Sequence, residues 1–362
     1  MYKGDGGVGK ASPMRCSRET APALSPRRRR QGRRGRISAY PCPINLSHKE
    51  TLLPPRSIFL SGGSGFVGGA VIDELLKRHD EIKALVNKRP IATAGVESIR
   101  ADLFDPPSLV AAMRGCTAVI HLVGIIAENP GAGVTFERMH FEATRNVVDA
   151  AKGAGVRRYI QMSALGTRAD AKSEYHKTKW KAEEYLRASG LEWTILQPSM
   201  IHGPRGEFMK MEAAWARKQA APFFFMPYFG RGLFGTGGAG LLQPVYVNDV
   251  ARAFVEAIDK PATIGKTYAL AGSDQVSWPQ MHGAVSEKIV GKRRASIALP
   301  AWYAKALAAV VPRRLLPFNR DQVIMSQEDN TATPAEMAAF ERDFGWRPGS
   351  FAATLAEYAA GL

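Results

Sequence analysis

Residues 57–77 constrain the fold more than any other stretch, because they join a strand-like run, a glycine turn and a helical pattern. The apolar run "SIFL" is followed at once by "SGGSGFVGGAVIDELLKR". Gly62, Gly65 and Gly68 have G-x-x-G-x-x-G spacing, and apolar residues recur after them at helical intervals. Such glycines let the backbone turn tightly and approach a pyrophosphate, which the start of the next helix attracts. The stretch predicts a dinucleotide-binding turn.

Strand-like and helix-like segments then alternate along the chain. The further predicted strands are 82–86, 97–101, 118–124, 157–164 and 192–199, and the predicted helices are 105–114, 136–152 and 175–188. This order predicts an α/β fold, a Rossmann-type doubly wound parallel sheet with right-handed crossovers. Ligand is expected over the C-terminal ends of the strands.

The nucleotide preference depends on the residues that follow the second strand. An NAD site usually carries an acidic residue there, but "ALVNKRP" offers Asn87, Lys88 and Arg89. Two cations suit the 2′-phosphate of NADP(H), which is therefore favoured, with NAD(H) and a merely solvated loop as the alternatives. Asp102, after the third strand, is predicted either to accept from the adenine amino group or to serve as a turn or cap residue.

Tyr175 and Lys179 in "SEYHKTKW" are four residues apart and so share one face of a predicted helix. A lysine ammonium beside a phenol, helped by an oxidised nicotinamide, lowers the phenol pKa and allows proton exchange with a carbonyl. The pair follows the fifth strand of a nucleotide-binding pattern. It predicts acid–base chemistry, with Tyr175 as the proton-transfer group.

These motifs resemble the short-chain dehydrogenase/reductase superfamily over about residues 57–360. The carriers are "GGSGFVG", "ADLFDPPSL", "VIHLVG", "YHKTK", "LQPSMIHGP", "LQPVYVNDVARAF" and "FGWRP". The chain looks most like the atypical, NAD(P)-dependent epimerase/dehydratase-like branch that contains the nucleotide-binding accessory subunit of respiratory complex I. The resemblance implies that the cofactor is lined by Gly62, Gly65, Phe66, Val67, Gly68, Asn87, Lys88, Arg89, Asp102, Leu103, Val123, Lys179, Pro198 and Ser199.

The resemblance also implies roles at the reacting centre. Lys179 would hold the nicotinamide ribose, and Pro198 and Ser199 would border the nicotinamide. Active members carry Ser or Thr beyond the fifth strand, where this chain offers Ser163 and, further along, Thr167. His140 stands where extended members usually have Asn, which departs from their water relay behind the lysine.

Residues 203–362 are predicted to form mainly a smaller α+β substrate or partner lobe, after a Rossmann domain at 55–202. Segments near 241–272, "YVNDV" (246–250) and "TYALAG" (267–272), are expected to return to the sheet. The aromatic stretch 221–230 suits a substrate lid or a partner surface, although core packing is favoured. The apolar stretch 298–318 permits a helix lying on a membrane, although a helix packed on the lobe is favoured.

Residues 1–54 are predicted to be a disordered basic leader, and residues 1–56 contribute most of the formal net charge of +16. "GDGGVGKA" (4–11) imitates a phosphate loop, but no strand fits before it and Ala11 replaces the magnesium-binding hydroxyl. The run "RRRRQGRRGR" is a solvated tail or an electrostatic contact with nucleic acid or anionic lipid, with no specific nucleic-acid binding expected. An Arg-rich organellar transit peptide remains an alternative.

Three further features bound the location and partners. No apolar run reaches the length of a bilayer span. Cys16, Cys42 and Cys116 are widely spaced, which predicts a reducing compartment and no metal site. The predicted location is cytoplasmic, with a peripheral position at the inner face of a membrane as the alternative.

Two functions follow from the sequence. The first is an NAD(P)H-dependent oxidoreductase or epimerase that acts on a carbonyl or alcohol centre of an unknown small molecule. The second is a non-catalytic nucleotide-binding accessory or assembly protein of a respiratory, complex I-like or quinone-handling system. The sequence does not choose between them.

Overall fold

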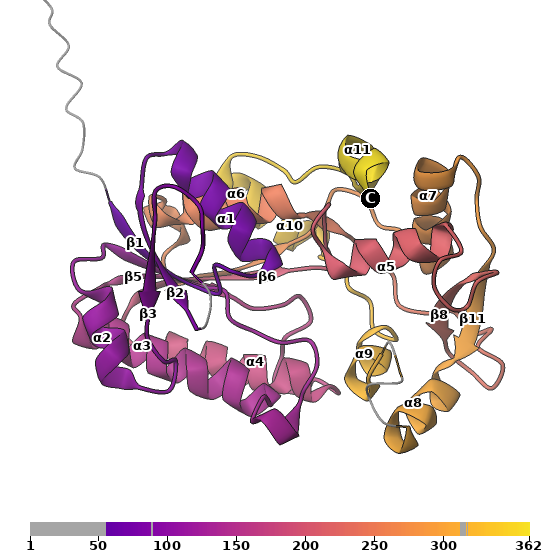
Figure 1. Cartoon of the computed structure of the whole chain (residues 1–362), viewed down its shortest axis with the longest axis horizontal. Coiled ribbons are helices and arrows are strands. Elements are labelled where there is room, and N and C mark those ends of the chain that lie inside the picture. Colours follow the sequence, from indigo (N-terminus) through magenta and orange to yellow (C-terminus); the bar gives the residue numbers. More distant parts are fainter. Residues whose placement is uncertain (1–55, 88–89, 312–315, 317) are drawn as a thin grey trace, which may run out of the picture. The chain divides into compact units, whose positions relative to one another are not determined.

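Seven parallel strands form the central sheet, in the order β10-β6-β5-β4-β1-β2-β3 (Figure 1). The computed structural model describes residues 56–87, 90–311, 316 and 318–362. The strands are β1 (Ser57–Ser61), β2 (Glu81–Val86), β3 (Val96–Arg100), β4 (Ala118–His121), β5 (Arg158–Met162), β6 (Glu192–Pro198) and β10 (Lys266–Leu270). Because β1 is flanked by β2 and β4, the sheet has a switch point there, and ligands of such sheets bind at its carboxyl edge.

Helices cover both faces of the sheet (Figure 1). One face carries α1 (Phe66–Lys77), α6 (Val247–Ile258) and α10 (Pro334–Phe344), and the other carries α2 (Pro106–Met113), α3 (Ala143–Gly153) and α4 (Glu174–Arg187). Strand β1 is apolar at successive positions because both of its faces are covered: Leu60 packs into the core on the α1 side and Phe59 into the core on the α2 side. The predicted α/β fold class is confirmed.

The predicted elements agree with the structure except near residue 246. The predicted helix 136–152 begins with a π-helical segment, η2 (Glu137–Glu142), before α3. The segment 267–272 does return to the sheet as β10. The segment 246–250 does not: helix α6 begins at Val247, and β9 (Val245–Tyr246) pairs with β7 (Ile201–His202) in a separate two-stranded sheet. The apolar residues of 246–250 pack as one side of a helix, which a short window does not distinguish from a strand.

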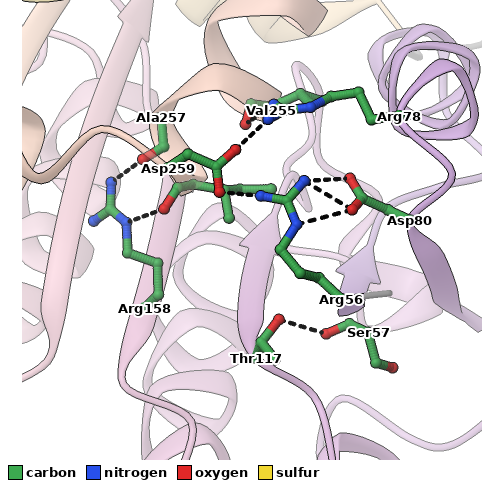
Figure 2. Close-up of polar contacts among 10 residues, drawn as sticks. Arg56, Ser57, Arg78, Asp80, Thr117, Arg158, Val255, Ala257 and Asp259 are labelled. Atoms are coloured by element: carbon green, nitrogen blue, oxygen red, sulfur yellow. Dashed lines mark hydrogen bonds and ion pairs between the residues drawn. The ribbon is translucent and has the colours of Figure 1, made fainter. Parts of the chain in front are cut away.

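A charged network fastens the amino-terminal edge of the sheet, opposite the carboxyl edge (Figure 2). Arg56 donates from Nε to Asp80 Oδ1 at 2.9 Å and from Nη2 to both Asp80 oxygens. Asp259, just after α6, accepts from Arg56 and from Arg78. The buried Arg158 guanidinium donates to the backbone oxygen of Ala257. These bonds join the starts of β1, β2 and β5 to the end of α6.

The remaining helices and longer strands lie between residues 207 and 358. They are α5 (Glu207–Ala216), β8 (Met226–Gly230), α7 (Trp278–Val290), β11 (Ser296–Pro300), α8 (Ala301–Val310), α9 (Arg320–Met325) and α11 (Phe351–Tyr358). Strands β8 and β11 pair in parallel. The favoured core packing of 221–230 is wrong in part, because Met226 is buried whereas Phe223 and Phe224 are exposed. Helix α8 packs on β8, β11 and α9 through one side only.

Some expectations lie outside the described residues. They are the leader with "GDGGVGKA" and its arginine run, Cys16 and Cys42, and the cations Lys88 and Arg89. The division at residue 203 stays a prediction. In the described ranges, no helix combines the length and the apolar character that crossing a bilayer requires.

Candidate functional site

The turn between β1 and α1 has the backbone geometry of a phosphate-binding turn. Gly62 has φ +84°, a left-handed conformation that favours glycine. A Cβ on Gly68 would lie 2.2 Å from the carbonyl oxygen of Gly62, so only glycine allows the helix to pack this closely on the turn. Helix α1 starts at Phe66 with no capping side chain and no acidic residue in its first turn. Its first N–H groups are therefore available to an anion.

The other predicted cofactor residues lie along the carboxyl edge that this turn begins. Val123 follows β4, Pro198 ends β6 and Asn87 follows β2, and Ser163, which was predicted as catalytic, follows β5 at the same edge. Leu103 lies just beyond β3, where its carbonyl oxygen accepts from Asn146 Nδ2 of α3 at 2.9 Å. The parallel pairing of these strands brings their ends to one edge. The described residues are thus placed where a dinucleotide would cross the switch point.

Two of these side chains are already engaged in local structure. Asp102 Oδ1 accepts from the backbone N–H of Phe104 at 2.9 Å, which is the geometry of a turn residue. The buried Ser199 hydroxyl donates to the carbonyl oxygen of Gln243 at 2.5 Å. The Ser199 hydroxyl proton is therefore committed to the protein.

Tyr175 and Lys179 project from one face of α4 toward the ends of β4 and β5. Lys179 is buried, its Nζ lies 3.4 Å from the carbonyl oxygen of Met162, and it lies 5.5 Å from the centroid of the Tyr175 ring. A Cβ on Gly124 would lie 3.3 Å from Nζ, so the glycine after β4 leaves room for the ammonium. Ser173 caps this helix by accepting from the backbone N–H of His176.

Burial decides the protonation of this pair. It lowers the pKa of the Lys179 ammonium from 10.5 to about 8, although the charge of Glu183 acts in the opposite direction. Burial raises the pKa of the Tyr175 phenol. This is the reverse of the lowering expected from the neighbouring lysine, because desolvation of a phenolate outweighs an ammonium lying over the ring. The protein alone therefore holds Tyr175 protonated, as a proton donor requires.

Ser163 and Thr167 come together after β5. Both are buried, and Ser163 Oγ donates to Thr167 Oγ1 at 3.3 Å. The Ser163 N–H donates to Leu196 O at 2.8 Å, which extends the β5–β6 pairing past the strand end. The two hydroxyls named as alternatives thus form one hydroxyl pair.

His140 joins the π-helical segment η2 to the proton-transfer helix. Its Nδ1 lies 2.9 Å from Thr178 Oγ1, and its Nε2 lies 3.0 Å from the carbonyl oxygen of Ile125. The Tyr175 ring meets His140 edge-on, with centroids 5.1 Å apart. Burial and the charge of Lys179 lower the pKa of His140 to about 2, so the ring is neutral. Both ring nitrogens face protein atoms, and His140 therefore positions Tyr175.

Sequence reasoning missed a buried polar row behind the pair. Ser61, His121 and Gln161 are register partners on β1, β4 and β5. Ser61 Oγ lies 2.5 Å from His121 Nδ1, while His121 Nε2 and Gln161 Oε1 have no hydrogen-bond partner among the described residues. The charge of Lys179 contributes, after burial, to lowering the pKa of His121 to about 3. A polar residue inside an apolar, strand-like run, such as the histidine in "AVIHLVG", could have indicated this row from the sequence.

Comparisons with known proteins support nucleotide binding. A family model described as NAD(P)H-binding matches residues 62–213, which include the glycine turn and the Tyr175–Lys179 pair. The chain is 29% identical to the mitochondrial NADH dehydrogenase (ubiquinone) 1 alpha subcomplex subunit 9 of Arabidopsis thaliana, over 68% of this chain and 61% of that protein. It is 25% identical to an NAD(P)H azoreductase of Xenophilus azovorans, over 63% of this chain and 72% of that protein.

A solved structure of an NADPH-dependent quinone oxidoreductase from Escherichia coli, complexed with NADPH, superposes with a TM-score of 0.65 at 21% identity. The superposition covers 83% of this chain and 99% of that one, and it shows the shared fold. Fold and site thus define an NAD(P)H-binding protein. The chain is similar to extended, epimerase-like short-chain dehydrogenases/reductases and to the complex I subunit.

Proposed function

We propose that the protein is an NADP(H)-dependent oxidoreductase that reduces a carbonyl centre of a small molecule. The observation that carries the proposal is the buried Lys179 ammonium beside a Tyr175 phenol held in its protonated form. Both lie on α4, whose preceding loop follows the carboxyl end of β5. In the reductive direction the enzyme must supply a proton, and Tyr175 is the protonated phenol beside Lys179 that would supply it.

The residues divide the task as follows. The glycine turn and the start of α1 would hold the pyrophosphate, and Lys179 would hold the nicotinamide ribose. When bound, a reduced nicotinamide supplies the hydride to the carbonyl carbon. Tyr175 donates its phenolic proton to the carbonyl oxygen, which becomes a hydroxyl. The Ser163–Thr167 hydroxyl pair orients that oxygen, and Lys179 stabilises the phenolate that remains.

The decisive test is Tyr175→Phe, which keeps the ring and removes its proton. We expect turnover to fall about a hundredfold or more, because that is the usual contribution of a positioned acid. NADPH affinity and thermal stability should stay close to those of the wild type. The assay is substrate-dependent NADPH oxidation across aldehydes, ketones, quinones, azo compounds and nucleotide sugars.

Tyr185→Phe is the matched control, because this tyrosine lies on the same helix and its hydroxyl donates to the exposed Asp149. It should turn over like the wild type. Full activity in Tyr175→Phe would exclude the proposed proton donor.

The preference for NADP(H) over NAD(H) rests on Lys88 and Arg89 and on the absence of a carboxylate after Val86. Isothermal titration should show tighter binding of NADPH than of NADH. The double variant Lys88→Ala, Arg89→Ala should reduce the difference in binding free energy between NADPH and NADH. The reduction should be about 1.5–3 kcal/mol for each strong charged hydrogen bond lost, and less where solvent screens the bond. Lys152→Ala, on the exposed side of α3, is the control for a changed net charge. Equal wild-type affinities would remove the basis of this preference.

A second function is favoured by the similarity to the NADH dehydrogenase subunit. In this alternative the protein binds NADP(H) without turnover, as an accessory or assembly factor at a respiratory or quinone-handling membrane system. It predicts no substrate-dependent NADPH oxidation in the wild type and no phenotype for Tyr175→Phe. Under either function we expect a cytoplasmic location, with a peripheral position at the inner face of a membrane as the alternative.

A further inference from the structure

Helix α8 turns an apolar face toward solvent. Its exposed residues share small or apolar character and recur at spacings of one, four, seven and eight: Trp302, Tyr303, Ala306, Ala309 and Val310. The buried residues on the opposite side of the helix are the small Ala301 and Ala304. A surface helix of a globular protein normally has the reverse arrangement, with its apolar stripe against the core. Helix α8 therefore leaves an apolar side in contact with solvent.

The loop after β8 extends this apolar face. Trp302 Nε1 donates to the carbonyl oxygen of Leu233 at 2.9 Å, which holds the loop against the start of α8. Leu233 is 66% exposed and Phe234 is 76% exposed. The Trp302 and Tyr303 rings lie 6.0 Å apart at the same end of the helix. We call Leu233, Phe234 and the exposed residues of α8 the apolar face.

A basic cavity borders the apolar face. Its volume is about 680 Å³, and Trp302 forms part of its wall. Lys172, Arg231, Lys305 and Arg320 also line it. Glu328, the only carboxylate among the described lining residues, pairs at 3.0 Å with Arg168, which does not line the cavity. The four lining cations are therefore not neutralised by the cavity's own acid.

We propose that the apolar face and the basic cavity dock the protein on the surface of an anionic bilayer. The apolar face would enter the boundary between headgroups and acyl chains, and the cavity cations would bind lipid phosphates. Trp and Tyr side chains prefer this boundary, and an interfacial helix combines buried apolar area with attraction to anionic lipid. A soluble anion would account for the cations alone, whereas a bilayer accounts for both features. The inference does not depend on whether the protein turns over a substrate.

The test measures binding of the full chain to vesicles of phosphatidylcholine, with and without phosphatidylglycerol. We expect the wild type to bind the anionic vesicles. The double variant Trp302→Ser, Val310→Ser should bind them with an affinity at least about tenfold lower. Lys305→Glu with Arg320→Glu should weaken binding similarly at low salt. The basic leader is unchanged in all variants, and high salt should suppress its electrostatic contribution while leaving the difference due to Trp302 and Val310.

Matched controls separate docking from general surface effects. Ile264→Ser removes an exposed apolar side chain next to β10, and Lys152→Glu with Lys288→Glu reverses two exposed charges on other helices. Neither should change vesicle binding. Brominated acyl chains should quench wild-type tryptophan fluorescence, and Trp302→Phe should lose most of that quenching while still binding.

Thermal melting and NADPH titration establish that each variant is folded. Wild-type levels of vesicle binding in the serine double variant would overturn the proposal. A wild type that does not bind anionic vesicles would also overturn it. A change of oligomeric state in that variant without a change in vesicle binding would overturn it too, and would assign the apolar face to a protein contact. Tyr175→Phe should bind vesicles normally, so failure of the proposed chemistry is distinguishable from failure of docking.

Discussion

The buried charge of Lys179 lowers the stability of the protein at a position that suits cofactor binding. Lys179 is 4% exposed, and among the described residues its ammonium makes one long hydrogen bond, 3.4 Å to the carbonyl oxygen of Met162. The nearby carboxylate Glu183 is already held by Arg187 at 2.6 Å and Gln197 at 2.8 Å. A charge that is removed from water and only partly compensated opposes folding. The position suits a cation that finds its full set of partners in a bound cofactor.

We expect Lys179→Met to stabilise the protein at pH 7 while abolishing turnover. The pKa of Lys179 is about 8 in the folded chain, compared with 10.5 for a lysine exposed to water. The charged folded state is therefore penalised by about 3 kcal/mol below pH 8. Between pH 8 and 10.5 the unfolded chain binds more protons, so wild-type stability should rise with pH and approach that of the variant. Urea unfolding across this range measures the difference.

Lys177→Met is the control for this measurement, because Lys177 lies on the same helix in an exposed ion pair with Glu174. Its free energy of unfolding should change by less than about 0.5 kcal/mol. Destabilisation by Lys179→Met at pH 7 would mean that the ammonium is well compensated in the folded protein.

At the scale of elements, the junction of β1 and α1 couples packing to binding. Gly68 lies in the first turn of α1, against the backbone of Gly62 and Gly63. This close approach sets where the free N–H groups at the start of α1 point. A methyl group added at Gly68 must displace backbone atoms, because the atoms nearest to it belong to the backbone and not to a flexible side chain.

We expect Gly68→Ala to lower the free energy of unfolding by about 1–3 kcal/mol, the usual cost of overpacking, and to weaken NADPH binding at least about tenfold. Gly69→Ala is the matched control, because its methyl group would meet only the end of the exposed Arg205 side chain, at 3.3 Å. That variant should be neutral or slightly stabilising, as alanine favours a helix over glycine. Thermal melting and NADPH titration compare the two. Equal effects at both positions would contradict the packing argument.

At the scale of the whole molecule, the two ends of the chain should contribute unequally to stability. The composition of residues 1–50 provides no apolar pattern for a core. Helix α11 instead buries Phe351 and Leu355 in the core on the α1 side of the sheet. The ends therefore differ in how much apolar surface they remove from water.

We expect deletion of residues 1–50 to leave the melting temperature and the NADPH affinity nearly unchanged. Deletion of residues 351–362 should lower the melting temperature by at least about 5 °C, because it exposes that part of the core. Differential scanning calorimetry compares the two truncations. A large loss of folded protein on removing the leader would contradict the expectation.

Local sequence patterns were sufficient for most of the architecture, and they predicted where the candidate site lies. The strand–turn–helix of residues 57–77 and the alternation after it indicated the fold class, because apolar periodicity and glycine positions act within a few residues. The four-residue spacing placed Tyr175 and Lys179 on one helix face for the same reason. The helix that begins at Val247 was missed because strand and helix patterns coincide over five residues.

The tertiary structure decided what depends on residues distant in sequence. The burial of Lys179 and the raised pKa of Tyr175 arise where α4 meets the ends of β4 and β5. The pairing of Ser61 with His121 and the outward apolar face of α8 likewise depend on which surfaces the other elements cover. A residue's own neighbours in the chain determine its backbone conformation, whereas its solvation and its protonation are set by segments that only folding brings near.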